Sequence, residues 1–255
     1  MDNKCIKAHD DWASDYDDYD TKPFFQFLSE IINLQVKNHI PKCGKILDAA
    51  GGTGTNAISL ANKGYDVVMT ELSDKMISFT KLKKDSDKIR IVKSDLINMN
   101  QFQDNEFDFA MCVGNAVSYC DSLKALNELK RVSKSGSYII FDIHSFYQLQ
   151  RKCIKSSDSK KLERLQKSHL FFNEDYDEHG FTIEEIEKLV SDSGLELIEI
   201  FGKMILPNIQ NTDKMNELLT DKEYYKLLFN SEIKVFNKKE YLSCALELGV
   251  VCKVK

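Results

Sequence analysis

The sequence contains no apolar run close to the ~20 residues that a helix needs to cross a bilayer. Its first residues, MDNKCIKAHDDW, lack the apolar segment of a secretory signal. We therefore expect no membrane span and no secretory leader. The seven cysteines are scattered and form no C-x-x-C pair, which argues against a zinc ribbon or a disulfide framework. This pattern favours reduced thiols in a cytoplasmic protein.

The chain is also short of positive charge, with 35 Lys and Arg against 40 Asp and Glu and a net charge of −5. Its one basic tract, RKCIKSSDSKKLERLQK at 151–167, is followed at once by the acidic NEDYDEH at 173–179. A solvated, charge-paired helix accounts for that tract. The acidic balance therefore argues against nucleic acid as a partner.

The 255 residues contain no repeat and no low-complexity linker, so we expect one domain. Between residues 44 and 144, β-rich runs alternate with helical patterns. The expected strands are KILDAA, YDVVMTE, KIRIVKS, FDFAMCV and SYIIFDIH. Such alternation is typical of βαβ units and predicts a mostly parallel α/β sheet with helices on both faces.

The C-terminal part has a different order of elements. The helical pattern at 182–194 begins with a capping box, Thr182 with Glu185, and ends at a glycine suited to a C-cap. Strands are expected at 195–202 and 245–255, with a mostly helical pattern between them. After such an insertion the last strand can return antiparallel to its neighbour.

The stretch ILDAAGGTGTNA joins an apolar strand to a helix through a glycine-rich turn. Within it, Gly52 to Ala57 fits G-x-G-x-x-A, the spacing of turns that bring backbone N–H groups and a helix N-terminus to a dinucleotide. Glu71 ends the next expected strand, where its carboxylate can accept both hydrogen bonds of a ribose diol. A nicotinamide dinucleotide and S-adenosylmethionine both fit these features.

Asp48 distinguishes between these two candidate ligands. It ends the first strand just before the turn, where the pyrophosphate of a dinucleotide would lie. A carboxylate there repels phosphate and attracts an ammonium or sulfonium group, and S-adenosylmethionine carries both cations and no phosphate. Asp48 therefore favours S-adenosylmethionine, with a cap on the turn backbone as the structural alternative.

Several segments in order resemble the class I S-adenosylmethionine-dependent methyltransferases, in particular members that act on small molecules. ILDAAGGTG is similar to the family's first motif, VVMTELSDKMI to its second strand, and VKSDLINM to the segment that meets the adenine. Residues 107–143 are similar to its fourth-strand, helix, fifth-strand stretch. Ala50 stands where the family's first glycine usually lies, and SKSG at 133–136 replaces the common K-P-G-G turn. The resemblance implies a Rossmann-like, mostly parallel seven-stranded sheet with an antiparallel last strand.

The resemblance also implies where the cofactor binds. Glu71 is expected at the ribose, and Asp95 and Leu96 at the adenine. Asp48 is expected to face the amino-acid end of the cofactor, and the loop that begins at Gly114 is expected to face the transferring methyl group. The full set of implied cofactor-binding residues is Asp48, Ala49, Ala50, Gly51, Gly52, Gly54, Glu71, Leu72, Met76, Ser94, Asp95, Leu96, Val113, Gly114, Asn115 and Ala116.

Three residues are candidates for the acceptor side of the reaction. His144, at the end of the fifth strand, is a candidate base for a hydroxyl or thiol acceptor. Tyr119 follows the fourth strand, and Tyr16 belongs to an N-terminal segment that covers the cofactor in many relatives. The structural alternatives are a polar strand cap for His144, packing on the next helix for Tyr119 and a solvated acidic helix for Tyr16. That acidic segment lacks the glycine of a calcium loop, so we predict no metal site.

We therefore predict a single methyltransferase domain over residues 1–255. It would comprise a helical lid at 1–40, a cofactor-binding core at 44–143, and helical inserts at 145–180 and 203–244 that shape the acceptor site. The predicted reaction is in-line methyl transfer to a small-molecule acceptor. A nicotinamide-dependent oxidoreductase, a non-catalytic S-adenosylmethionine-binding regulatory protein, and an RNA or protein acceptor are the alternatives. The sequence identifies neither the acceptor nor the oligomeric state.

Overall fold

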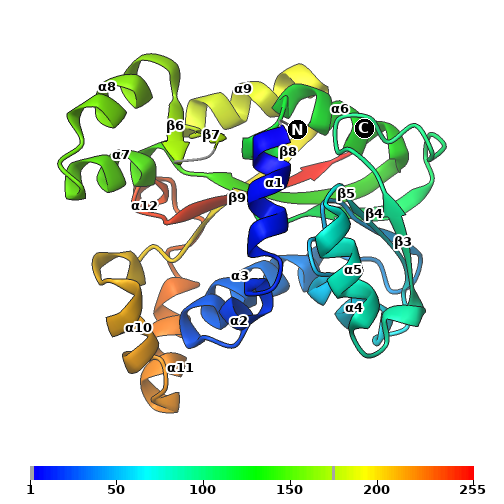
Figure 1. Cartoon of the computed structure of the whole chain (residues 1–255), viewed down its shortest axis with the longest axis horizontal. Helices are drawn as coiled ribbons and strands as arrows, with labels where there is room; N and C mark the ends of the chain where they lie inside the picture. The colour runs from blue at the N-terminus through cyan, green and yellow to red at the C-terminus, as the bar shows by residue number, and fades with distance from the viewer. Residues whose placement is uncertain (1–2, 174–175) are drawn as a thin grey trace.

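A computed structural model describes residues 3–173 and 176–255 (Figure 1). Its main sheet has seven strands in the order β3-β2-β1-β4-β5-β9-β8. These strands are β1 (Lys45–Asp48), β2 (Asp66–Glu71), β3 (Ile89–Lys93), β4 (Phe107–Cys112), β5 (Ser133–His144), β8 (Glu196–Lys203) and β9 (Glu247–Lys253).

The strand directions confirm the predicted fold class. Strands β1 to β5 pair in parallel, while β9 is antiparallel to both of its neighbours, β5 and β8. The chain order reverses between β1 and β4, which lie side by side. In open α/β sheets, ligands bind at the carboxyl ends of the strands at such a switch point.

Helices cover both faces of the sheet. In Figure 1, α6 and α9 lie on one face, and α3, α4 and α5 lie on the other. None of the helices in the described ranges combines the length and the apolarity that crossing a bilayer requires. The helices are α1 (Asn3–Trp12), α2 (Tyr16–Asp20), α3 (Pro23–His39), α4 (Thr55–Ala61), α5 (Asp74–Leu82), α6 (Ser122–Val132), α7 (Phe146–Lys155), α8 (Ser159–Ser168), α9 (Ile183–Ser193), α10 (Thr212–Leu218), α11 (Lys222–Glu232) and α12 (Lys239–Leu242).

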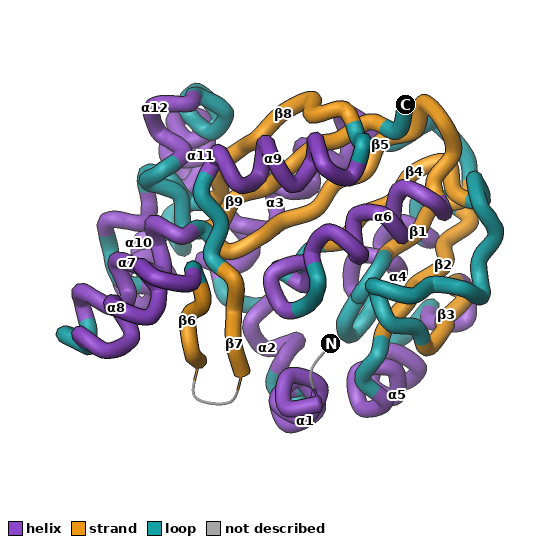
Figure 2. The backbone as a smooth tube through the Cα atoms, turned by 90° about the horizontal axis from the view of Figure 1, so that it is seen from above, coloured by secondary structure: helices purple, strands orange, loops and turns teal. Residues whose placement is uncertain are grey.

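The structure divides the predicted N-terminal lid, residues 1–40, into two parts. Helix α3 does not lie over the cofactor region, because it packs the apolar side chains of Phe24, Phe27 and Ile31 into the core against the sheet. Helices α1 and α2 lie at the edge of the sheet instead. Figure 2 shows α1 between α5 and β7, and it contacts both.

The predicted helical insert at 145–180 is wrong in its second half. After α7 and α8 the chain forms a two-stranded antiparallel hairpin of β6 (Leu170–Asn173) and β7 (Tyr176–His179). Burial alternates along β7, where Tyr176 and Glu178 are buried and Asp177 between them is exposed. This period of two residues suits a strand, and the charged residues of the segment conceal it in the sequence.

Candidate functional site

A cavity lies at the carboxyl edge of the sheet, beside the switch point. Its walls come from the residues that follow β1, β2, β3 and β4, and from α1 and α2. The predicted cofactor residues that line it are Ala50, Gly52, Glu71, Leu72, Met76, Ser94, Asp95, Leu96, Val113, Gly114 and Ala116.

The other predicted cofactor residues lie outside the lining. Asp48 and Ala49 are fully buried beneath the turn, and Asn115 is buried behind the cavity wall. Gly51 and Gly54 shape the turn, since a side chain at either position would collide with neighbouring atoms. A Cβ would lie 2.7 Å from Met69 at Gly51 and 2.5 Å from Thr80 at Gly54. Their contribution is to the path of the backbone.

The glycine-rich turn has left-handed backbone at three positions. Gly52 has φ 58° and Gly54 has φ 76°, which glycine adopts without strain. Ala50 has φ 54°, so the residue that replaces the family's first glycine keeps a glycine-like conformation. The conformational cost of replacing glycine by alanine therefore falls on the Ala50 backbone.

Glu71 fastens the turn to the end of β2. Its Oε2 accepts the N–H of Gly52 at 2.9 Å, and its Oε1 accepts the N–H groups of Leu72 and Ser73 at 2.7 and 2.9 Å. Three backbone donors therefore fix the carboxylate at the cavity wall. That position suits hydrogen bonds to the diol of a ribose.

Asp48 is a buried carboxylate whose desolvation is only partly compensated. Neither of its oxygens has a hydrogen-bond partner in the described part of the chain, and its exposed fraction is 0%. Burial raises its pKa from 3.8 to about 7, and the charge of Glu71 adds to the rise, while the backbone N–H of Ala57 opposes it. A nearby cationic ligand group would favour the ionised form of this buried carboxyl.

The turn after β4 is fixed by a buried acid that sequence reasoning missed. Asp142 on β5 accepts the N–H groups of Gly114 and Asn115 through Oδ1, at 2.8 and 2.6 Å. Its Oδ2 pairs with Lys203 Nζ at 2.5 Å, and the same ammonium lies 2.5 Å from Glu247 Oε2. These two acids outweigh the effect of burial and raise the pKa of Lys203. The only sequence signal is a lysine within an apolar strand.

Helices α1 and α2 close the cavity from above. Ile6, His9 and Tyr16 line it, and of these only Tyr16 was predicted. A Cβ at Gly114 would lie 3.6 Å from the Tyr16 hydroxyl, and one at Gly52 would lie 3.6 Å from its ring. Tyr16 therefore spans the space between the two glycine turns.

Polar contacts tie these helices to the cofactor side of the site. The Ser73 hydroxyl donates a hydrogen bond to Asp10, and Thr53 Oγ1 donates to Asp17 Oδ1 at 2.6 Å. Asp17 also pairs with Lys83 at 2.8 Å. Ser73 lines the cavity as well and caps α5, a role that its position just before an acidic first turn could have indicated.

Tyr119 and His144, both predicted, meet at the far side of the cavity. The Tyr119 hydroxyl lies 2.9 Å from His144 Nε2, and the Tyr119 side chain lines the cavity. His144 does not line it and lies behind the tyrosine. Glu178 of β7, which the sequence did not indicate, approaches the same nitrogen at 3.5 Å. Burial lowers the pKa of His144 against the opposing charge of Glu178, so the imidazole is neutral at neutral pH.

The charge of the cavity fits S-adenosylmethionine better than a dinucleotide. Its lining in the described residues includes the carboxylates of Glu71 and Asp95 but no lysine or arginine. A pyrophosphate would meet no cation there, whereas an ammonium or sulfonium group would meet favourable charge.

Residues 47–141 match a protein family described as a methyltransferase domain. This segment of the chain is a methyltransferase domain, as the resemblance predicts. The chain is 26% identical over 192 residues to YqeM of Bacillus subtilis (strain 168), whose name assigns it to the methyltransferases, and the match covers 64% of this chain and 77% of YqeM. S-adenosylmethionine is its cofactor, as predicted.

Two further comparisons relate this methyltransferase to proteins with more specific names. It is 31% identical over 110 residues to a glycine/sarcosine N-methyltransferase of Parasynechococcus marenigrum (strain WH8102), covering 41% of this chain but only 39% of that protein. In fold it is similar to a solved methyltransferase from Thermotoga maritima, with a TM-score of 0.63 and 20% identity over 96% of this chain and 97% of the other. The second likeness concerns the fold alone.

Proposed function

We propose that this methyltransferase acts on a small-molecule acceptor that carries a removable proton on oxygen, sulfur or nitrogen. The observation that carries this proposal is the 2.9 Å contact between Tyr119 and His144. It puts a hydroxyl at the cavity wall and a neutral imidazole directly behind it. An acceptor that has no proton to lose would not need such a pair.

The cofactor would be held by the residues around the first four strand ends. Glu71 would bind the ribose, and Asp95 and Leu96 would enclose the adenine. Asp48 would balance the positive charge at the amino-acid end of the cofactor. When bound, S-adenosylmethionine supplies an electrophilic methyl group. The turn from Gly114 to Ala116, held by Asp142, would leave its backbone open to the acceptor. The task of these residues is to align the acceptor and exclude water.

Tyr119 and His144 would together move one proton. As the acceptor loses its proton to the Tyr119 oxygen, the Tyr119 hydroxyl proton passes to His144 Nε2. The tyrosine remains neutral, which is consistent with burial raising its pKa well above the usual range. Glu178 then lies beside the imidazolium that forms and stabilises it. Tyr119 is the catalytic residue in this scheme, and Glu178 is a positioning residue.

A small acceptor is supported by the enclosure of the site. Helix α1 and the β6–β7 hairpin meet over Tyr119. The ring of Tyr176 packs edge-on against the ring of Tyr119, with 5.4 Å between the ring centroids. Residues 3–20 and the β6–β7 pair would thus cover the site, and we keep as part of the proposal that the inserts, including residues 203–244, shape the acceptor pocket of a single domain. The name of the Parasynechococcus relative gives glycine and sarcosine as its acceptors, which are small molecules. The seven cysteines are free thiols, which suits a cytoplasmic location.

The test combines binding with turnover. Calorimetric titration with S-adenosylmethionine is followed by assays of S-adenosylhomocysteine release with a panel of thiols, phenols and amines that includes glycine and sarcosine. Tyr119→Phe is expected to keep cofactor affinity and to lower turnover by about 10²- to 10⁴-fold, the usual contribution of a proton-transfer group. Tyr138→Phe, on the same sheet but distant from the cavity, is the matched control. Saturable binding without turnover on the whole panel would favour the regulatory alternative.

A further inference from the structure

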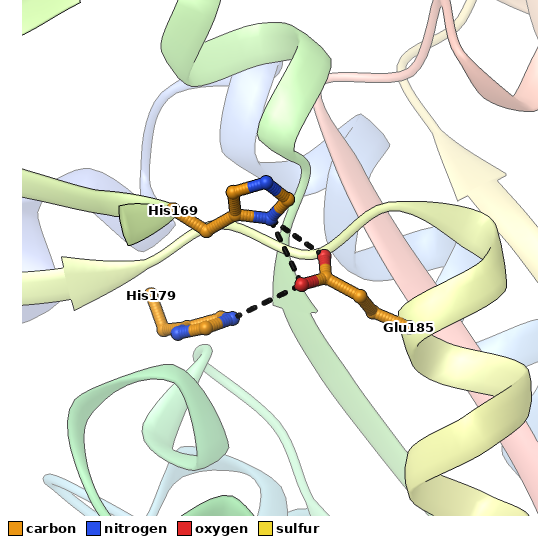
Figure 3. A group of neighbouring side chains, drawn as sticks. All are labelled: His169, His179 and Glu185. Carbon is orange, nitrogen blue, oxygen red and sulfur yellow. Dashed lines mark hydrogen bonds and ion pairs between the residues drawn. The ribbon is translucent and has the colours of Figure 1, made fainter. Parts of the chain in front are cut away.

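A cluster of metal-ligating side chains lies outside the cavity, at the base of the β6–β7 hairpin. Figure 3 shows His169, His179 and Glu185 with both imidazole rings turned toward the carboxylate. His169 Nδ1 lies 2.9 Å from the Glu185 carboxylate, and His179 Nε2 lies 3.9 Å from Oε1 of the same group. One ligand atom from each residue falls within 4.8 Å of the other two.

The hairpin and the start of α9 bring these residues together. Leu170 pairs with His179 across the hairpin, and Gly180 donates its N–H to the carbonyl of His169 at 2.8 Å. The positive φ of His169, 56°, turns the chain from α8 into β6 at this point. The sequence predicts no metal here, because a His–x₉–His spacing is not a recognised ligand pattern and only the hairpin register makes it one.

Neighbouring groups hold each of the three side chains in place. The ring of His169 packs on Phe146 at 4.4 Å between centroids, and that of His179 packs on Phe181 at 4.2 Å. Glu185 Oε2 accepts the N–H of Thr182 at 2.9 Å as part of the capping box of α9. Fixed ligands lose little conformational freedom on binding an ion, and carboxylates that bind metals are themselves commonly hydrogen-bonded, as Glu185 is here.

We propose that His169, His179 and Glu185 bind one divalent transition-metal ion of the zinc class. Two imidazole nitrogens and one carboxylate form a ligand set that zinc prefers, with a fourth position left for solvent. At Zn–ligand distances of about 2.0–2.2 Å, ligand atoms lie about 3.4 Å apart, so the three groups need move only slightly. Their side chains are 29–35% exposed, which gives an ion access from solvent.

The ion would join the hairpin to α9. It would thereby restrain residues of the hairpin that pack against Tyr119, which lines the cavity. Strand β7 ends at His179 and carries Tyr176 and Glu178, which lie against Tyr119 and His144. A metal at the base of the strand would restrain these two residues. The metal site does not depend on the reaction proposed above, and its test does not use activity.

The experiment is calorimetric titration of the full chain with ZnCl₂, together with visible absorption of Co²⁺ as a probe. One ion per chain is expected, with affinity lowered at least about tenfold, roughly 1.4 kcal/mol, in His169→Ala and in His179→Ala. Glu185→Gln is expected to weaken binding while keeping the capping box, since glutamine serves equally at that position. The matched control is His39→Ala, a partly buried histidine outside the cluster.

A second measurement distinguishes Zn²⁺ binding at this site from Zn²⁺ binding by the exposed thiols of Cys43 and Cys244. Hydrogen exchange of β6 and β7 is expected to slow when Zn²⁺ is added to the natural chain, and to be unchanged by Zn²⁺ in His179→Ala. Cys43→Ser with Cys244→Ser is expected to keep both the stoichiometry and this protection. Either no saturable Zn²⁺ binding, or binding that survives the histidine substitutions and is lost with the cysteines, would overturn the proposal.

Discussion

The Glu71 carboxylate accepts the backbone N–H of Gly52 at 2.9 Å and thereby joins the end of β2 to the glycine-rich turn after β1. The same carboxylate also accepts the N–H groups of Leu72 and Ser73, so three backbone donors orient it. The acid that is expected to bind the ribose is therefore also the acid that shapes the turn.

Replacing Glu71 by glutamine is expected to weaken S-adenosylmethionine binding by roughly 10- to 100-fold. The substitution keeps the size of the side chain but removes the charge that strengthens its hydrogen bonds, which are worth about 1.5–3 kcal/mol each. Calorimetric titration measures the effect, and Glu106→Gln is the control, since Glu106 pairs with Lys45 away from the cavity. Equal affinity in Glu71→Gln and the natural chain would refute the ribose assignment.

The raised pKa of Asp48 predicts how the free energy of unfolding of the ligand-free protein depends on pH. Its folded-state pKa is raised to about 7 from 3.8, so the proton favours the folded state. The stability that protonated Asp48 contributes is present below about pH 4 and is lost as the pH rises through about 7. A shift of this size corresponds to roughly 4 kcal/mol.

Urea denaturation of the natural chain and of Asp48→Asn between pH 4 and 8 checks this expectation. The asparagine side chain of the variant cannot ionise, so the free energy of unfolding should fall with pH more steeply in the natural chain than in the variant. S-adenosylmethionine should raise the melting temperature of the natural chain more at pH 8 than at pH 5, because its cation compensates the ionised carboxylate. A difference between the two proteins that does not change with pH would contradict the assignment.

Replacing Ala50 by glycine is expected to stabilise the folded protein. Its φ of 54° costs an L-residue about 1–2 kcal/mol, and glycine adopts this conformation freely. Ala50→Gly is expected to raise the free energy of unfolding by about 1 kcal/mol and the melting temperature by a few degrees. Ala49→Gly is the matched control, because Ala49 is buried without a positive φ, and there the loss of the methyl group should lower the melting temperature.

The sequence predicts which residues gather at the carboxyl edge of the sheet, because the determinants of that edge are local. A parallel sheet brings successive strand ends to one edge, so the residues after KILD, DVVMTE, IRIVK and FDFAMC had to meet there. The electrostatic argument about Asp48 needed only its place at the end of a strand. The family's spacing then supplied Asp95 and Leu96, which line the cavity.

The surroundings of Tyr119 and the cover of the cavity were predicted only in part, because their contacts join distant segments. Ile6 and His9 reach the cavity because α1 packs between α5 and β7, a docking that no pattern within residues 3–12 indicates. Glu178 meets His144 through a hairpin that the acidic composition conceals. In each case the partner lies far along the chain, and tertiary packing decides the contact.

Lys203 is the central cation of a buried charge network with Asp142 and Glu247. The Lys203 side chain is 1% exposed between Asp142 and Glu247, so Lys203→Met would leave two buried acids without the cation that pairs with them. Breaking a buried pair in this way costs about 3–5 kcal/mol. Without the cation the two acids should protonate more readily, so the deficit should be smaller at pH 5 than at pH 8.

Chemical denaturation at the two pH values measures the deficit of Lys203→Met. Lys188→Met is the control, because its ion pair with Asp192 is exposed and contributes less than about 1 kcal/mol. Adding Asp142→Asn to Lys203→Met should recover part of the stability by removing one of the unpaired charges. If Lys203→Met is as stable at pH 8 as the control, the network does not hold the turn after β4, and Asp142 would be fixed by the N–H groups of Gly114 and Asn115 alone.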